Sequence, residues 1–194
     1  MRITLIGKGR LGLAIAKALE TSGHGINGYA IEFARLDPDK GLVLAERTSV
    51  STPIFIETAV FCLVPRHPEG GSGWLGLFDG LQKQTESKKI KIGRALFISS
   101  TAVYECIEFG WVDYQTPVHP VNSRTEGLLS AETAIRTLCE HTAVFRLTGL
   151  TGPGYHKYDP VSFSHDRPRQ AVDIRAVAKV VAGYLSTGWQ GHKT

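Results

Sequence analysis

Residues 1–19 read MRITLIGKGRLGLAIAKAL, a short apolar stretch followed by three glycines and then by an alanine- and leucine-rich segment. Gly7, Gly9 and Gly12 have the Gly-x-Gly-x-x-Gly spacing, between a candidate strand and a candidate helix. In a dinucleotide-binding unit, the first glycine permits the turn, the second lets backbone N–H groups approach a pyrophosphate, and the third lets the helix pack on the sheet. A tight turn without a ligand would use the same glycines, but the position between strand and helix favours a dinucleotide site.

Length and composition predict one ordinary globular domain. The chain has 194 residues, of which 42% are hydrophobic and 21% are charged. The sequence contains no apolar run of the roughly 18 residues that a membrane span needs, and its first strand lacks the form of a signal peptide. We therefore expect a cytoplasmic protein.

The cysteines and charges exclude several other classes. Cys62, Cys106 and Cys139 are odd in number and form no CxxC pair, and the loop histidines lack metal-ligand spacing, so we expect neither a disulfide framework nor a metal site. The net charge is +4, but only Lys88, Lys89 and Lys91 cluster. A solvated face explains this better than a nucleic-acid partner.

Strand and helix patterns alternate along the chain. Strands are expected at residues 26–31 (ending at Glu32), 59–64, 94–99 and 143–147, and helices at 74–81 and 123–141. This alternation predicts an α/β fold with a doubly wound parallel sheet, the Rossmann arrangement of three α/β/α layers. Ligands of such sheets bind at the carboxyl ends of the strands.

Five further segments, in order after the glycine motif, carry a family resemblance. They are FISSTAVYE (97–105), WVDYQTPVHP (111–120), NSRTEGLLSAE (122–132), FRLTGLTGPG (145–154) and AVDIRAVAKVV (171–181). Together they resemble the extended short-chain dehydrogenase/reductases, the group of nucleoside-diphosphate-sugar epimerases and dehydratases, and in particular an atypical, epimerase-like subgroup. The resemblance implies an NAD or NADP cofactor, a sugar-nucleotide or small carbonyl substrate, and dimerisation through the helix at 123–141.

The chain departs from this family at its catalytic pair. The family uses Tyr-x-x-x-Lys, in which the lysine lowers the pKa of the tyrosine so that the phenol exchanges a proton while hydride moves. Counting back from Glu132, which resembles the family's acidic residue after the lysine, Arg124 stands at the tyrosine position and Leu128 at the lysine position. Family members also continue beyond residues 172–174 into a substrate-covering lobe, so we expect residues 155–194 to be a reduced remnant of that part.

Several residues are candidates for the cofactor site. Glu32 lies where an acid accepts hydrogen bonds from the adenosine ribose of NAD, which favours NAD slightly, although Arg10 or Arg35 could serve a 2′-phosphate. The predicted cofactor-binding set is Gly7, Lys8, Gly9, Arg10, Leu11, Gly12, Glu32, Val64, Pro65 and Ser99.

Three residues are candidates for catalysis, each with a plainer alternative. Ser100 matches the serine that orients a substrate in the family, but it could equally cap the strand end. Tyr104 could replace the missing acid, although this tyrosine is usually structural in the family. Arg124 could bind a phosphate or carboxylate, or simply face solvent.

Two functions remain open at this point. The first is a reductase or epimerase-like enzyme that uses Ser100 and an unusual acid. The second is a catalytically silent NAD(P)-binding sensor or protein-interaction module, which the missing tyrosine and lysine favour.

Overall fold

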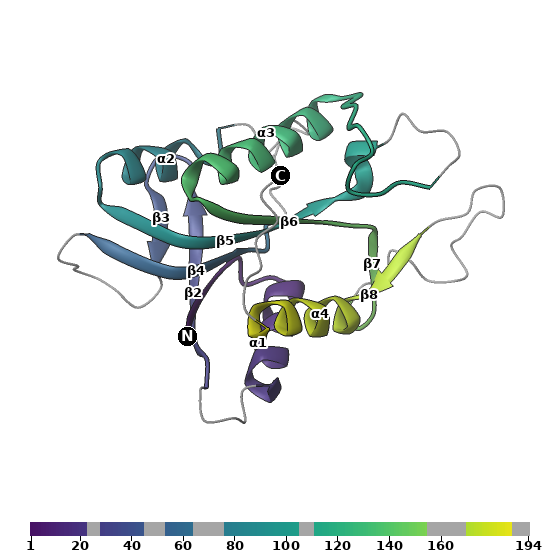
Figure 1. Ribbon diagram of the computed structural model, residues 1–194, viewed down its shortest axis with the longest axis horizontal. Helices are drawn as coiled ribbons and strands as arrows, with labels where there is room; N and C mark the ends of the chain where they lie inside the picture. The colour runs from purple at the N-terminus through teal and green to yellow at the C-terminus, as the bar shows by residue number, and fades with distance from the viewer. Residues whose placement is uncertain (23–27, 45–52, 64–75, 105–110, 155–169, 188–194) are drawn as a thin grey trace.

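Six strands form one sheet at the centre of the molecule (Figure 1). The computed structural model describes residues 1–22, 28–44, 53–63, 76–104, 111–154 and 170–187. The sheet has the order β3-β2-β1-β4-β5-β6, from β1 (Arg2–Ile6), β2 (Ala30–Asp37), β3 (Gly41–Leu44), β4 (Ile54–Phe61), β5 (Ile90–Ser100) and β6 (His141–Leu147). Two short strands, β7 (Gly149–Thr151) and β8 (Ala171–Asp173), pair separately in parallel.

The strands are parallel except for β3, which pairs with β2 in the antiparallel direction. Only residues 38–40 separate these two strands, and so short a connection can form a hairpin but not the crossover that parallel strands need. The predicted fold class is confirmed, and the sheet has an antiparallel edge strand, β3, in addition to its parallel strands.

Helices cover both faces of the sheet, and each face has its own apolar core. α1 (Arg10–Ser22) and α4 (Ile174–Ser186) lie together on one face, with Ile3, Leu5, Val60 and Leu96 beneath them. α2 (Asp79–Glu86) and α3 (Ser123–Leu138) lie on the other face, and the short 3-10 helix η1 (Thr101–Tyr104) follows β5. These layers place the ends of β1, β4 and β5 beside the start of α1 (Figure 1).

Several element boundaries differ from the prediction. β4 begins at Ile54 and β5 at Ile90, before the expected residues 59 and 94, and α3 ends at Leu138, before the expected residue 141. The second strand begins at Ala30 and continues to Asp37, so it does not end at Glu32. The helix expected at 74–81 begins at Asp79 and ends at Glu86, because Phe78 is its N-cap residue and packs into the core before the helix starts. The apolar pattern identified the correct segments. It did not mark where each helix begins, because residues outside a helix, such as Phe78, also pack in the core.

The C-terminal segment contributes a helix that was not expected. Ile174, Val177, Ala178, Val181, Ala182 and Leu185 form the buried side of α4 and pack in the same core as α1. Asp173 accepts a hydrogen bond from the Arg175 N–H at 2.7 Å and caps the helix. The helix that follows residues 171–173 therefore packs in the same core as α1.

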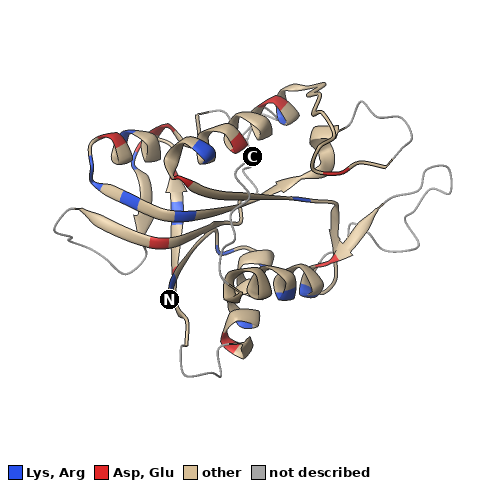
Figure 2. Cartoon of the chain, viewed as in Figure 1, with Lys and Arg blue, Asp and Glu red and all other residues tan. Residues whose placement is uncertain are grey.

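Charged residues of both signs are spread over the helices and strands (Figure 2). Within the described part of the chain, no helix is long and apolar enough to cross a membrane. The same residues contain no group of three or more metal-ligating side chains.

Candidate dinucleotide site

The glycine loop joins β1 to α1 in a conformation that needs glycine at two positions. Gly7 has a φ of +110°, and a Cβ there would lie 2.5 Å from the Cys62 carbonyl oxygen. A Cβ at Gly12 would overlap the Gly7 carbonyl oxygen. The Gly7 N–H donates to the Ala34 carbonyl at 3.0 Å, which fixes the loop at the carboxyl edge of β2. The predicted turn is therefore present, and α1 can approach the sheet only without these side chains.

Gly9 differs from the other two glycines because a Cβ there would meet nothing within 4 Å. Its carbonyl accepts the Leu13 N–H at 2.9 Å, in the first turn of α1. Leu11 is buried and anchors that turn in the core. Open space over backbone at the N-terminus of a 13-residue helix is an arrangement that accommodates a phosphate group.

The Gly-Pro-Gly turn lies beside this loop. Gly154 has a φ of +79°, and a Cβ there would lie 3.2 Å from Cδ of Arg10. Gly152, with a φ of +109°, packs against Asp173 and Ile174 at the start of α4. The glycine loop, residues 152–154 and the start of α4 are far apart in the sequence and thus lie next to one another in the fold.

Glu32 does not occupy the position expected of a ribose-binding acid. Strand pairing places it beside Thr4 in the interior of β2, and its Oε1 accepts a hydrogen bond from the Thr4 hydroxyl at 2.7 Å. Ile6, the last residue of β1, pairs with Ala34, so the next residue of β2 is Arg35. The geometric reason for favouring NAD was therefore wrong, because the second strand extends further than its sequence pattern indicated.

Two cations stand beside the loop on the α1 side of β2. The Arg35 side chain is 64% exposed, and its Nη1 contacts Asp37 Oδ2 at 3.2 Å. Lys8 Nζ lies 5.3 Å from the centre of the Phe33 ring, a cation–π distance. Because Phe33 and Arg35 are two residues apart in one strand, their side chains share a face. Two cationic side chains and the carboxylate of Asp37 therefore lie beside the glycine loop.

Three further residues, Val64, Pro65 and Ser99, were predicted to bind the cofactor. Val64 and Pro65 fall outside the described residues. Ser99 is buried, and its hydroxyl donates to Glu132 Oε1 at 2.6 Å. Ser99 therefore turns toward α3, away from the glycine loop.

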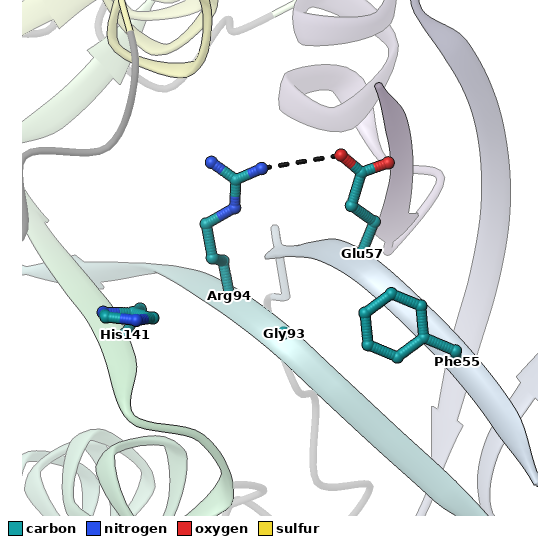
Figure 3. Close-up of a pocket in the computed structure, with 5 residues that line it drawn as sticks. All are labelled: Phe55, Glu57, Gly93, Arg94 and His141. Carbon is teal, nitrogen blue, oxygen red and sulfur yellow. Dashed lines mark ion pairs between the residues drawn. The ribbon is translucent and has the colours of Figure 1, made fainter.

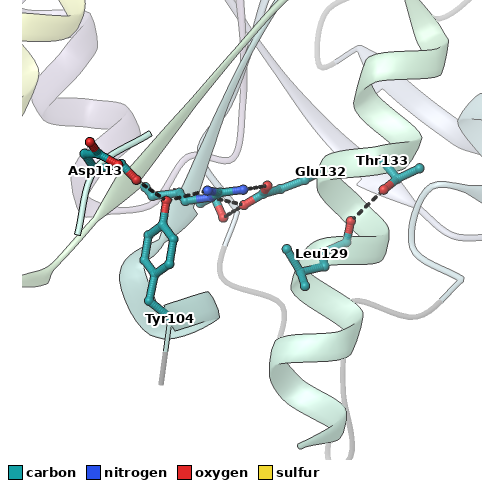
Figure 4. A network of polar contacts seen from close by, with 7 residues as sticks. Tyr104, Asp113, Leu129, Glu132 and Thr133 are labelled. Atoms are coloured by element: carbon teal, nitrogen blue, oxygen red, sulfur yellow. Dashed lines mark hydrogen bonds and ion pairs between the residues drawn. The ribbon is translucent and has the colours of Figure 1, made fainter. Parts of the chain in front are cut away.

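Glu132 belongs to a buried polar network at the carboxyl end of β5 and β6 (Figure 4). Arg146 holds its carboxylate with two hydrogen bonds, Nε to Oε1 at 3.0 Å and Nη2 to Oε2 at 2.7 Å. The hydrogen bonds to Glu132 raise the pKa of the Arg146 guanidinium. Arg146 also donates from Nη1 to the Tyr104 hydroxyl at 2.5 Å, and Tyr104 donates to the Asp113 carbonyl at 3.1 Å.

This network determines what Tyr104 can do. The side chain is buried, and its hydroxyl both accepts a hydrogen bond from Arg146 and donates its proton to Asp113. These contacts are those of a structural tyrosine that ties η1 to β6 and to residue 113. They argue against Tyr104 as the substitute acid.

Ser100 and Arg124 have simple surroundings. The Ser100 hydroxyl accepts the Ala102 N–H at 3.2 Å, which is the strand-end cap foreseen as its alternative. Arg124 lies exposed in the first turn of α3, while Leu128, one turn later, is buried in the core. The side chain at the family's lysine position is thus part of the apolar core beneath α3.

Arg146 was not predicted as a partner of Glu132. Arg35 was named only as an alternative, in case the cofactor has a 2′-phosphate. Arg146 falls within an apolar strand pattern, where a charged residue indicates a buried partner. The register of β2 is what reveals Arg35, and the sequence pattern did not fix that register.

No protein-family model and no curated protein sequence matches the chain. Solved structures do match. A dTDP-4-dehydrorhamnose reductase from Clostridium acetobutylicum is 17% identical with a TM-score of 0.64, and the match covers 96% of this chain and 71% of that one. The dTDP-glucose 4,6-dehydratase of Bacillus anthracis, in complex with NAD, is 16% identical with a TM-score of 0.63, covering 97% and 72%.

The human epimerase family protein SDR39U1 with NADPH is also 16% identical with a TM-score of 0.63, and the match covers 96% of this chain and 70% of that one. The chain therefore shares the fold of these three proteins, and the resemblance read from its motifs is confirmed at the level of the fold. One of these structures holds NAD and another NADPH, so the fold alone does not choose between the two cofactors.

Proposed function

We propose that the chain is an NADP(H)-binding module of the short-chain dehydrogenase/reductase fold, which binds its dinucleotide without the family's tyrosine–lysine proton relay. The observation that carries this proposal is the open backbone at Gly9, between Gly7 and Gly12, which have no room for a side chain. A pyrophosphate would lie against this backbone, where the N-terminus of α1 stabilises negative charge.

The two cations at the ribose end support NADP(H) over NAD(H). NADP carries an additional 2′-phosphate, and a guanidinium can bind a phosphate with two hydrogen bonds. Arg35 follows directly on the β2 residue that pairs with the end of β1, and its contact with Asp37 holds the side chain at this edge. Lys8 adds a second positive charge on the same side.

The surroundings of the candidate acids support a binding role. Tyr104 is engaged by Arg146 and Asp113, Ser99 by Glu132, and the position of the family's lysine is the buried Leu128. Arg124 stays protonated near neutral pH and so does not exchange protons. A protein with these residues can bind a dinucleotide and so sense its concentration. Epimerisation would need in addition a side chain that exchanges protons.

Calorimetric titration of NADPH into wild type and Gly9→Asp tests the site. An aspartate at residue 9 fits the fold, because nothing lies within 4 Å, but it repels a pyrophosphate. Gly183→Asp is the matched control, since Gly183 in α4 also has open space around it. Binding to wild type and the control, and its loss in Gly9→Asp, supports the proposal. Wild type that does not bind NADPH or NADH refutes it.

Arg35→Ala tests the preference between the two dinucleotides. We expect NADPH affinity to fall about tenfold or more, as for loss of a charged hydrogen-bonding partner, with little change for NADH. Arg136→Ala, which removes an exposed arginine from α3, should alter neither affinity. If Arg35→Ala lowered the affinity for NADPH and for NADH equally, Arg35 would not be the residue that binds the 2′-phosphate.

Ser100 favours a second candidate function, a reductase for small carbonyl compounds. Its hydroxyl lies at the carboxyl end of β5, where it could bind a carbonyl oxygen while NADPH supplies hydride and water supplies the proton. NADPH oxidation with a panel of aldehydes and ketones, compared between wild type and Ser100→Ala, separates the two functions. Turnover that falls in Ser100→Ala with unchanged NADPH affinity would favour the reductase.

A further inference from the structure

Lys8 lies in surroundings that disfavour a cation. It follows Gly7 in the glycine loop, it is exposed, and α1 begins two residues later at Arg10. The N-terminus of a helix carries partial positive charge, which acidic residues in the first turn offset, but the first turn of α1 contains none. Arg10 adds a further positive charge. The charge of Lys8 is therefore unfavourable here unless an anion binds nearby.

The Lys8 side chain contacts the ring of Phe33. Nζ lies over the ring, 5.3 Å from its centre, where the aromatic electrons attract a cation. Phe33 belongs to β2 and pairs with Leu5 of β1, and its half-buried side chain packs against the core beneath α1. Packing thus fixes the ring, and the ring limits where the flexible lysine side chain lies.

A ring differs from a carboxylate as the partner of a cation, because it attracts the charge without cancelling it. Arg94 faces Glu57, with Nη2 3.5 Å from Oε1 (Figure 3), and Arg146 is held by Glu132. Lys8 forms no such ion pair with any described residue. The Lys8 ammonium is therefore held in place while its charge stays available to an anion.

The face of β2 that carries Phe33 also carries Arg35. The two residues are two apart in the strand, which places them about 7 Å from each other on one face. Arg35 Nη1 contacts Asp37 Oδ2 at 3.2 Å, while Asp37 Oδ1 accepts the N–H groups of residues 39 and 40. Asp37 is thus held by its own turn and holds Arg35, as Phe33 holds Lys8. Two cations with separate supports lie side by side.

We propose that Phe33 is a positioning residue for NADP(H), whose ring holds the Lys8 ammonium beside Arg35 so that both cations bind the 2′-phosphate. This role rests on the proposed function and adds to it the residue that directs Lys8. A phosphate monoester carries close to two negative charges at neutral pH, which matches two cations. NAD(H) has a hydroxyl group in its place, so Phe33 favours NADP(H) without touching the phosphate.

Two other roles of Phe33 lead to different expectations. A ring that only fills the core contributes to stability and not to binding. A ring that stacks on the adenine contributes equally to both dinucleotides, because NADPH and NADH share this base. Because the ring packs on the core and the ammonium lies over it, the contacts support positioning.

Calorimetric titration of NADPH and NADH into variants of Phe33 and Lys8 tests the proposal. Phe33→Leu keeps an apolar side chain but removes the ring, and we expect the dissociation constant of NADPH to rise about three- to fivefold, with that of NADH unchanged. Phe33→Tyr keeps the ring and should keep the wild-type affinity. In Lys8→Met the NADPH affinity should fall about tenfold, and adding Phe33→Leu should cause no further loss.

Phe145→Leu is the matched control. The Phe145 side chain packs on the same core from β6, where its ring lies 5.1 Å from that of Tyr184. The substitution removes a ring from this core without changing a partner of Lys8, so the affinities for NADPH and NADH should stay as in wild type. Circular dichroism checks that each variant is folded.

Proton NMR of the chain without nucleotide measures the contact itself. Protons above an aromatic ring resonate upfield because of the ring current, so the signals of the Lys8 Cε protons should lie upfield of those of the other lysines. This shift should persist in Phe33→Tyr and in Phe145→Leu and disappear in Phe33→Leu. A Lys8 signal that Phe33→Leu does not move would overturn the proposal.

The titrations separate this role from the dinucleotide site itself. If Phe33→Leu leaves the NADPH affinity unchanged, or lowers the affinities for NADPH and NADH equally, the positioning role is wrong while the site stands. The same holds if the loss persists in the Lys8→Met background. Wild type that binds neither dinucleotide refutes the proposed function, and the role of Phe33 with it.

Discussion

Arg146 and Glu132 meet in a doubly hydrogen-bonded ion pair that joins β6 to α3, with side chains that are 19% and 4% exposed. Ser99 donates to the same carboxylate, so each oxygen of Glu132 has a protein donor. A buried charge is stabilised by its partner, and removal of the partner is costly because water has little access to the remaining charge. The pair fixes the carboxyl end of the sheet next to the candidate site.

Glu132→Gln should therefore destabilise the fold strongly. The amide leaves Arg146 without a countercharge, and we expect the free energy of unfolding in urea to fall by about 3 kcal/mol. In a chain of this size that corresponds to a decrease in Tm of roughly 6–12 °C. Arg35→Ala, which breaks an exposed pair with Asp37, is the control and should cost less than about 1 kcal/mol. Similar losses in both variants would contradict the proposed role of burial.

Tyr104→Phe separates a structural role from a catalytic one. The substitution leaves the ring in the core but removes the acceptor for Arg146 and the donor to Asp113. We expect a loss of about 1–2 kcal/mol in the free energy of unfolding, with NADPH affinity unchanged. If instead stability were preserved while NADPH oxidation, measured with a carbonyl substrate, disappeared, Tyr104 would be the proton donor after all.

Gly12 and Gly9 should respond differently to substitution by alanine. Gly12→Ala places a Cβ against the Gly7 carbonyl and should lower the free energy of unfolding by about 1–3 kcal/mol. Gly9→Ala has open space around it, so it should leave stability unchanged or raise it slightly. Urea titrations of the two variants measure this difference. Equal destabilisation would mean that α1 does not pack on the sheet as described.

The sequence predicted the parts of the site that are local. The glycine turn follows from the φ of +110° at Gly7 and from the contact of Gly12 with the Gly7 carbonyl oxygen, both of which lie within the loop. The start of α3 is equally local, because the Asn122 side chain accepts the Thr125 N–H three residues later. Periodicity alone could also have identified α4, since its apolar residues recur at helical spacing.

The parts that escaped prediction depend on which strands are neighbours. Glu32 was placed at a strand end because its apolar run ends there. In the structure β2 pairs with β1 as far as Ala34, and its pairing with β3 extends the strand through Arg35 to Asp37. Ser99, Glu132 and Arg146 come from β5, α3 and β6, and no spacing in the sequence shows that they meet.

Cys62 gives a prediction about pH. Burial beneath α1 raises the pKa of its thiol to about 12 from an ordinary value near 9. The folded chain therefore keeps this proton where the unfolded chain loses it. The thiol's contribution to stability is fully present below pH 9 and is lost progressively as the pH rises from 9 toward 12.

Urea unfolding of wild type and Cys62→Ala at several pH values between 8 and 11 isolates this contribution, because tyrosines and lysines titrate equally in both proteins. At pH 8 the variant should be less stable, since alanine leaves part of the space under α1 empty. That difference should shrink as the pH rises, because only wild type has a thiol that must stay protonated to fold. A difference that stays constant over this range would show that the Cys62 thiol titrates as it does in the unfolded chain.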